Sequence, residues 1–177
     1  MIFPLNFALF CLHYIIRIIS PLVKDRKDVL IKIFIDGDGS PTKQETIQLA
    51  KKYDLPVVLV TSIDHFSKKP VADHVETVYV ERGADSADFK ILSMISAGDI
   101  VVTQDYGLAS LALAKAIVIH HSGMIYTDMN IDQLLRQRYE NQQMRKAKMR
   151  TKGPKPFTAA DRQHFIQVLD KIIQDRL

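Results

Sequence analysis

A chain of 177 residues with 47% hydrophobic amino acids is long enough for one domain with a substantial core. Its single cysteine, Cys11, excludes a disulfide framework and any zinc site built from cysteines, and it favours a reducing cytoplasm. The net charge of +4 is unevenly spread, because residues 29–135 carry a net charge of −5 and residues 136–155 carry +7. This asymmetry is typical either of contact with nucleic acid or a membrane, or of a solvated basic helix face.

The first 29 residues differ in composition from the rest of the chain. Met1 to Ile16 is nearly all apolar, but it is short for a spanning helix, which needs roughly 20 such residues. It also lacks the basic start and the small-residue cleavage site of a signal peptide. We interpret residues 1–29 as an N-terminal extension, either a start codon assigned too far upstream or a membrane-proximal segment, and we expect no firm membrane association.

From residue 30 onward, short strand-like runs alternate with helical stretches. The strands are predicted at residues 31–36, 56–61, 75–80, 100–103 and 116–119. The helices between them are predicted to begin at Ser40 with Pro41 as the first helical residue, at Asp85 or Ser86, and at about Gly107. This alternation predicts an α/β fold with a doubly wound, mainly parallel sheet flanked by helices.

The C-terminal part is predicted to be helical. A helix from about Ile131 runs into the basic stretch, which a Gly-Pro-rich segment at residues 152–156 ends. Thr158 then caps a last helix, with Asp161 at the capping-box distance. The apolar stripe of this helix is formed by Phe165, Leu169, Ile172 and Ile173. We therefore predict a domain over residues 30–150, and a loop and helix over residues 151–177 that pack on it as a C-terminal helical extension.

Acidic side chains fall where the predicted strands end and helices begin. Asp36 and Asp38 follow the first strand, Asp85 and Asp88 lie around a helix start, and Asp105 follows the fourth strand. Each alone is explained as a turn or capping residue. At the carboxyl end of a parallel sheet, where α/β proteins bind ligands, they would repel one another unless a cation lay between them. The pattern predicts bound Mg²⁺ or Mn²⁺, which prefer oxygen ligands.

A site that binds such an ion indicates hydrolysis of a phosphodiester, because the ion polarises a phosphoryl oxygen and lowers the pKa of a bound water. Asp36 and Asp105 are the expected direct ligands. Asp38, Asp85 and Asp88 are expected to bind metal, hold its waters or act as a base. We therefore treat all five as candidate catalytic residues, and as metal ligands we predict Asp36, Asp38, Asp88 and Asp105.

Residues outside this acidic set are predicted to contact substrate phosphate. Ser40 and Lys43 lie near the start of the first helix, whose free N–H groups also suit a phosphate. The basic stretch would hold a nucleic-acid backbone without reading its sequence, through Arg145, Lys146, Lys148 and Arg150. RNA or another nucleic acid is the expected partner, and the sequence leaves the oligomeric state open. For His120-His121 an exposed or capping position is favoured over a phosphate contact.

Five segments of the chain match a known pattern in order and spacing. They are IDGDGSPTK (35–43), VERGADSADFKIL (80–92), AGDIVVTQDYGLA (97–109), YTDMNID (126–132) and KGPKPFTAADRQHF (152–165). They resemble the YaiI/YqxD family of small bacterial proteins, which have a PIN-like domain. The resemblance implies a PIN-like α/β sandwich with the five aspartates at the family's acidic positions. PIN domains are typically Mg²⁺- or Mn²⁺-dependent ribonucleases, so it also implies nuclease activity. Ser40 stands where the family usually has cysteine, which argues against cysteine chemistry there.

Two other functions remain open. A haloacid-dehalogenase-like phosphatase also places Asp-x-Asp after an apolar strand, so that Asp36 would be a covalent nucleophile and Asp38 the general acid. The spacing of Asp99 and Asp105 fits that family's last acidic motif poorly, and its lysine motif is not evident. A non-catalytic PIN-like protein that binds RNA or a protein partner also fits the sequence. The acidic residues indicate only that a metal can bind, and they do not show that it supports catalysis. Turnover of a phosphodiester separates this interpretation from the nuclease.

Overall fold

The computed structural model describes residues 31–177 except 68–70, 84 and 148–155. Within it, Ile31–Leu177 forms one compact unit. The predictions for residues 1–29, for Lys148 and Arg150, and for most of the Gly-Pro-rich segment lie outside the described residues. In the part of the chain that is described, no helix combines the length and the apolar character needed to cross a membrane.

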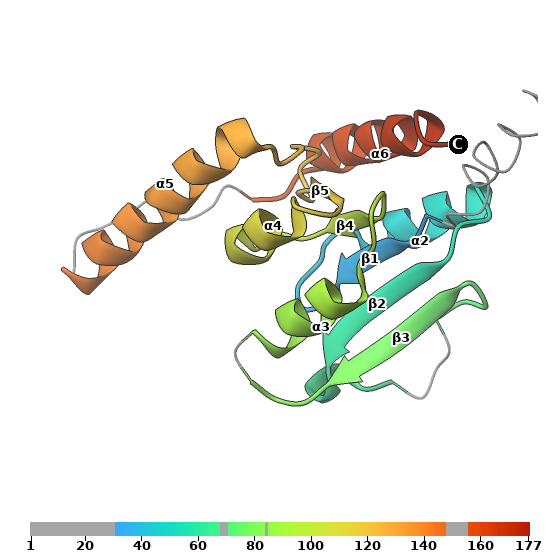
Figure 1. The fold of residues 1–177 in the computed structure, drawn as a ribbon, viewed down its shortest axis with the longest axis horizontal. Helices are drawn as coiled ribbons and strands as arrows, with labels where there is room; N and C mark the ends of the chain where they lie inside the picture. The colour runs from blue at the N-terminus through green and yellow to red at the C-terminus, as the bar shows by residue number, and fades with distance from the viewer. Residues whose placement is uncertain (1–30, 68–70, 84, 148–155) are drawn as a thin grey trace, which may run out of the picture. The chain divides into compact units, whose positions relative to one another are not determined.

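A five-stranded sheet in the order β3-β2-β1-β4-β5 forms the centre of the fold (Figure 1). Neighbouring strands pair in parallel, which confirms the predicted α/β class and doubly wound sheet. The strands are β1 (Ile33–Asp36), β2 (Val57–Ser62), β3 (Val75–Val80), β4 (Ile100–Val102) and β5 (Ile117–Ile119). The chain moves from β1 out to β3 and then returns to the other side of β1. The order therefore reverses between β1 and β4, where open α/β sheets bind ligands beyond the carboxyl ends of their strands.

Helices cover both faces of the sheet. On one face, α2 (Lys43–Lys52) and α6 (Ala159–Gln174) pack with Ile33 and Ile35 of β1. On the other face, Phe34 of β1 packs with residues of three helices. These are α3 (Ser86–Met94), α4 (Tyr106–Ala112) and α5 (Asp128–Lys146). Because successive side chains of a strand point to opposite faces, β1 contributes to both cores.

The last helix forms as predicted. Thr158 and Asp161 make a capping box in which the Thr158 N–H donates to Asp161 Oδ2 at 2.9 Å and the Asp161 N–H donates to Thr158 Oγ1 at 3.2 Å. The predicted apolar stripe is buried on the sheet, with Phe165 and Leu169 fully covered. Burying such side chains stabilises the domain by roughly 1.5–3 kcal/mol each.

The predicted N-cap at Ser40 is wrong, because α2 begins at Lys43 with Thr42 in the N-cap position. The Ser40 hydroxyl is buried without a hydrogen-bond partner among the described residues, so it accepts no bond from the helix. Gly39 has a φ of 87° and turns the chain before the helix. Arg162 of α6 donates to the Pro41 carbonyl at 2.9 Å, which holds that turn from a distant part of the chain.

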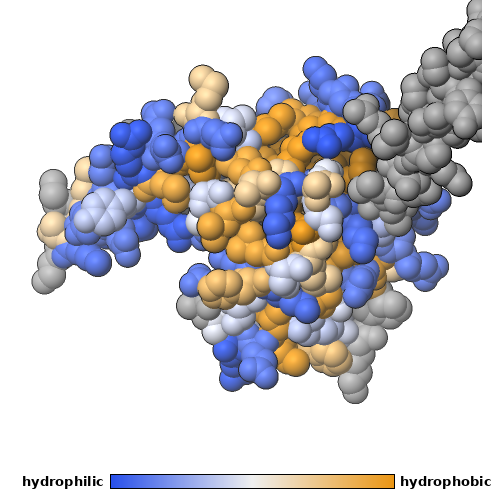
Figure 2. Space-filling view, in the orientation of Figure 1, coloured by the Kyte–Doolittle hydropathy of each residue, from blue (hydrophilic) through white to orange (hydrophobic). Residues whose placement is uncertain are grey.

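Helix α5 differs from the others in its exposure. Ile131 is its only buried residue, and the part of the helix beyond its first turns extends away from the sheet (Figure 1). That extending part is mostly hydrophilic on the side shown in Figure 2. Arg145 and Lys146 lie exposed in its last turn.

Candidate functional site

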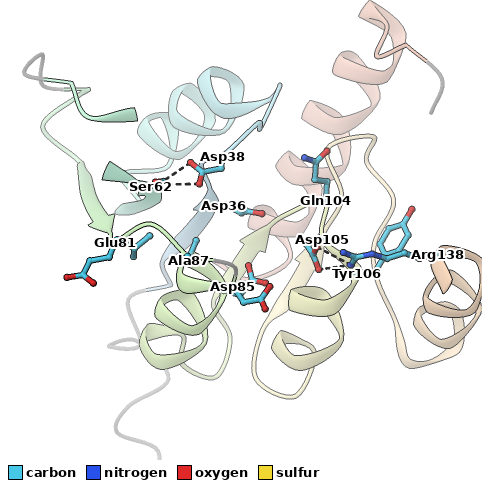
Figure 3. Close-up of a pocket in the computed structure, with 13 residues that line it drawn as sticks. Asp36, Asp38, Ser62, Glu81, Asp85, Ala87, Gln104, Asp105, Tyr106 and Arg138 are labelled. Carbon is cyan, nitrogen blue, oxygen red and sulfur yellow. Dashed lines mark hydrogen bonds and ion pairs between the residues drawn. The ribbon is translucent and has the colours of Figure 1, made fainter. Parts of the chain in front are cut away.

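A cavity of about 520 Å³ lies at the carboxyl end of the sheet, beyond the ends of β1 and β4 (Figure 3). Each of the predicted acidic residues contributes to its lining: Asp36, Asp38, Asp85, Asp88 and Asp105. They come from the end of β1, the start of α3 and the start of α4. The topology therefore brings together groups that are up to about seventy residues apart in the chain.

Asp36 ends β1, and one side chain among the described residues donates to it. Its Oδ2 accepts a hydrogen bond from Thr103 Oγ1 at 2.8 Å. Burial raises the pKa of Asp36, and the nearby charges of Asp38 and Asp105 raise it further, against the opposing hydrogen bonds from Thr103 and from the backbone of Asp38. Asp36 is therefore a carboxylate whose charge the protein only partly compensates.

Asp38 is bound by the end of the neighbouring strand. Its Oδ1 accepts hydrogen bonds from Thr61 Oγ1 at 2.6 Å and from the Ser62 N–H at 3.2 Å. His65 Nε2 lies 3.7 Å from the same oxygen. In Figure 3 the Asp38 carboxylate accordingly faces Ser62. These contacts connect the loop after β1 to β2.

Asp105 caps α4 and pairs with an arginine of α5. Its Oδ1 accepts from the Gly107 N–H at 2.6 Å and from the Leu108 N–H at 3.1 Å. Arg138 Nη1 lies 3.1 Å from both carboxylate oxygens. Burial alone would raise the pKa of Asp105, but the hydrogen bonds from Arg138 and Leu108 outweigh it, so the pKa is lowered. Asp105 is therefore ionised and well compensated.

The two aspartates of α3 lack such compensation. Asp85 occupies the N-cap position with a φ of 63°, and its side chain makes no capping hydrogen bond, so capping does not account for it. Burial raises the pKa of Asp88 to about 6, helped by the charges of Asp105, Asp36 and Asp85 and opposed by Arg138. No hydrogen-bond donor to Asp88 is found in the described part of the chain.

The site thus holds two kinds of carboxylate. Asp38 and Asp105 are each occupied by several protein donors, whereas Asp36 and Asp88 have few and their pKa values are raised. Within the described ranges, no group of three or more acidic, histidine or cysteine side chains forms a metal site by itself. The arrangement supplies a partial set of oxygen ligands and an excess of negative charge that a cation would relieve.

Arg138 lines the cavity although the sequence analysis did not predict it as a site residue. It lies 33 positions from Asp105 in the chain, and its only local signal is its place in the basic stretch. Its side chain is 51% exposed, and it is the only Lys or Arg among the described residues that line the cavity. Glu81, Gln104 and Tyr106 also line the cavity without having been predicted.

The described residues that were predicted to contact substrate phosphate do not line the acidic cavity. Ser40 and Lys43 are near the start of α2 and are not part of the cavity lining. Arg145 and Lys146 are at the far end of α5 and do not line it either. Within the described residues, the cation that lines the cavity beside the aspartates is Arg138, and not Lys43, Arg145 or Lys146.

Asp99 lies outside the site, at the amino end of β4. It is 2% exposed, and its carboxylate accepts from the Lys32 N–H at 2.9 Å and the Ser96 N–H at 2.7 Å. A phosphatase of the haloacid-dehalogenase type would need its acidic motifs together at the carboxyl end. The position of Asp99 removes it from any such set.

Comparison with known proteins agrees with the resemblance seen in the sequence. The family model described as "Uncharacterized BCR, YaiI/YqxD family" matches residues 34–175. A UPF0178 protein of Enterococcus faecalis is 53% identical over 148 residues, which are 83% of this chain and 100% of that protein. A UPF0178 protein of Bacillus cereus is 51% identical over 144 residues, 81% of this chain and 99% of its own length. No solved structure was found to match. The chain belongs to the YaiI/YqxD family.

Proposed function

We propose that this protein is a metal-dependent phosphodiesterase of the PIN-like type that hydrolyses RNA with Mg²⁺ or Mn²⁺ in the acidic cavity. The observation that carries the proposal is the gathering of five aspartates in one cavity at the point where the strand order reverses. Arg138 alone among the described lining residues balances their charge. A site with this surplus of carboxylates is suited to a divalent cation and the phosphate that accompanies it.

The carboxylates of the cavity fit a hard cation that keeps some of its water ligands. Asp36 accepts a hydrogen bond from one side chain among the described residues, and Asp105 lies near it, as the effect of Asp105 on the pKa of Asp36 indicates, so these two are the proposed ligands. Mg²⁺ is usually held by one or two carboxylates and keeps several waters or substrate oxygens. A complete cage of three protein ligands is therefore not required. When bound, such an ion supplies charge neutralisation at the phosphoryl group and a more acidic water.

The chain's own residues then have distinct tasks. Arg138 is half exposed and close to Asp105, so its guanidinium can donate to a phosphate oxygen that enters the cavity. Asp88 has no hydrogen-bond donor among the described residues and lies near Asp36 and Asp105, so it is the proposed general base that takes a proton from the attacking water. Thr103 orients Asp36, and Thr61 holds Asp38 against β2.

Hydrolysis of a fluorescently labelled single-stranded RNA by the full-length protein tests the proposal. We expect cleavage with Mg²⁺ or Mn²⁺ and none with EDTA. Asp88→Asn should lower the rate by about 10²–10⁴-fold, the range for loss of a general base, and Asp36→Asn by at least as much. Asp73→Asn is the matched control, because Asp73 is exposed and does not line the cavity.

The outcomes separate the alternatives. Cleavage that survives EDTA or Asp36→Asn would come from another site or another protein and would contradict the proposal. Tight binding of the RNA by the wild type without any turnover would support the non-catalytic RNA-binding protein instead.

A further inference from the structure

A second cavity, of about 760 Å³, adjoins the acidic one. The two cavities share Gln104 and Tyr106 in their linings. The rest of the second cavity includes His120 and His121, which follow β5, and Phe157, which precedes α6. The two cavities therefore border each other at Gln104 and Tyr106.

Aromatic rings gather in the lining of this second cavity. The rings of His120 and His121 are 3.9 Å apart between centroids, with a 34° angle between their planes. The ring of Phe157 meets His121 edge-on at 5.4 Å. Tyr126 lies behind them and contacts both His120 and Tyr106 edge-on, at 6.1 Å and 6.0 Å. Of these rings, those of Tyr106, His120, His121 and Phe157 line the cavity and offer stacking surface to a flat ligand.

The charges of the lining argue against a second phosphate site. Burial lowers the pKa of His120 to about 4 and lowers that of His121 as well, so both imidazoles are neutral at pH 7. Among the described residues of the lining there is no Lys or Arg, whereas Asp161 contributes a carboxylate. Arg162 lies over the Phe157 ring, 5.1 Å from its centroid, but it is paired with Glu45. An uncharged ligand suits this cavity better than an anion does.

The lining also offers directed hydrogen bonds. The Ser122 N–H donates to His120 Nδ1 at 3.1 Å, so Nδ1 is the acceptor and the hydrogen of the neutral ring is on Nε2. No acceptor for that Nε2–H is found among the residues that the structure describes. Gln104 adds an amide with both a donor and an acceptor. Flat rings with a few such groups beside them match the faces and edges of a heterocyclic base.

We propose that the second cavity binds a nucleobase of the RNA whose phosphate occupies the acidic cavity. This inference rests on the proposed function for the position of the phosphate, and it adds the part of the substrate that is recognised. The base packs against the edge-to-face pair of Phe157 and His121, stacking on the face of one ring and meeting the edge of the other, and Gln104 lies at the boundary between base and phosphate. Stacking of this kind accepts any base, so it predicts recognition of RNA without strong sequence preference.

Calorimetric titrations of the full-length protein in Mn²⁺ test the proposal with 5′-AMP, 5′-UMP and ribose 5-phosphate as probes. We expect both nucleotides to bind roughly tenfold more tightly than ribose 5-phosphate, as base stacking on aromatic side chains provides. Phe157→Ala and His121→Ala should each reduce that advantage to less than about twofold. Phe157→Tyr, which retains the ring, should keep it. Phe66→Ala is the matched control, because Phe66 is an exposed aromatic residue that lines neither cavity.

Titration with adenosine, which has no phosphate, separates this inference from the proposed function. Adenosine binding that is lost in Phe157→Ala supports the base cavity even where Mn²⁺ binding and RNA hydrolysis fail. Equal affinity for the nucleotides and ribose 5-phosphate would overturn the inference. So would a nucleotide advantage that survives both Phe157→Ala and His121→Ala in folded protein.

Discussion

Asp99 at the amino end of the sheet and Asp36 at the carboxyl end both adjoin buried strands, yet the protein satisfies them to different degrees. The Asp99 carboxylate accepts a backbone N–H at each oxygen, from Lys32 and from Ser96. Asp36 accepts a hydroxyl bond from Thr103, but burial and the charges of neighbouring aspartates still raise its pKa. The fold therefore satisfies the Asp99 carboxylate through its own backbone, whereas it compensates the charge of Asp36 only in part.

Replacing Asp99 should have the largest effect on stability. Asp99→Ala leaves the Lys32 and Ser96 N–H groups without their acceptor, so we expect the free energy of unfolding to fall by about 3 kcal/mol. Urea unfolding followed by circular dichroism measures it. Asp73→Ala, at an exposed position, should change it by less than about 0.5 kcal/mol. A loss of under about 1 kcal/mol in Asp99→Ala would mean that water replaces the carboxylate.

Metal should stabilise the domain through the aspartates at the carboxyl end, and not through Asp99. Mn²⁺ at ten times its dissociation constant should raise the free energy of unfolding by about 1.4 kcal/mol, and EDTA should reverse the gain. The gain should be absent in Asp36→Asn and retained in Asp99→Ala, which differs from the wild type only at the amino end. Thermal unfolding with and without Mn²⁺ measures it. An undiminished gain in Asp36→Asn would place the metal elsewhere.

The carboxyl end also holds a half-buried neutral imidazole, that of His120, which should make stability depend on pH. The pKa of His120 is about 4 in the folded protein and about 6.5 in the unfolded chain, so between these values only the unfolded chain binds the proton. Stability is therefore fully present above about pH 6.5 and falls as the pH is lowered toward 4. We expect His120 to contribute on the order of 1 kcal/mol, reduced by its partial exposure.

Urea unfolding at several pH values between 4 and 7 measures this dependence. His120→Gln should flatten it, although His121 leaves a residual slope in the same direction. His164→Gln is the control at an exposed histidine. An unchanged slope in His120→Gln would show that another group causes the acid sensitivity.

The smallest expected effect has the opposite sign to that at Asp99. In EDTA, Asp36→Asn should raise the free energy of unfolding by about 0.5 kcal/mol, because it removes a buried charge that Asp38 and Asp105 repel. The amide oxygen of asparagine still accepts from Thr103. Urea unfolding of both proteins in EDTA measures the difference. A loss of more than about 1 kcal/mol would mean that Asp36, like Asp99, serves the fold itself.

Features encoded by neighbouring residues were predictable from the sequence. The strand Val75–Val80 has the predicted bounds, and the Thr158–Asp161 capping box forms as expected, because an apolar run and a cap depend on a few adjacent side chains. The five aspartates gather in one cavity because each lies at a strand end or helix start, positions that the alternation of elements reveals.

Features that depend on distant partners were not predictable. The start of α2 depends partly on Arg162, which donates to Pro41 across 121 residues of the chain. Arg138 pairs with Asp105 only because α5 packs beside α4. For the same reason the sequence could not distinguish the well-compensated carboxylates from the others. That distinction depends on Thr61, Thr103 and Arg138, none of which is adjacent in the chain to its acceptor.

The position of α6 has a consequence for how the protein is made. Phe165, Leu169 and Ile173, near the end of the chain, complete the core that Ile33 and Ile35 begin near its start. During synthesis, the part of this sheet face that α6 covers therefore stays exposed until residues 159–174 have left the ribosome. A chain that lacks α6 would expose this apolar surface and tend to aggregate, so we expect the domain to reach its native state only after α6 has been synthesised.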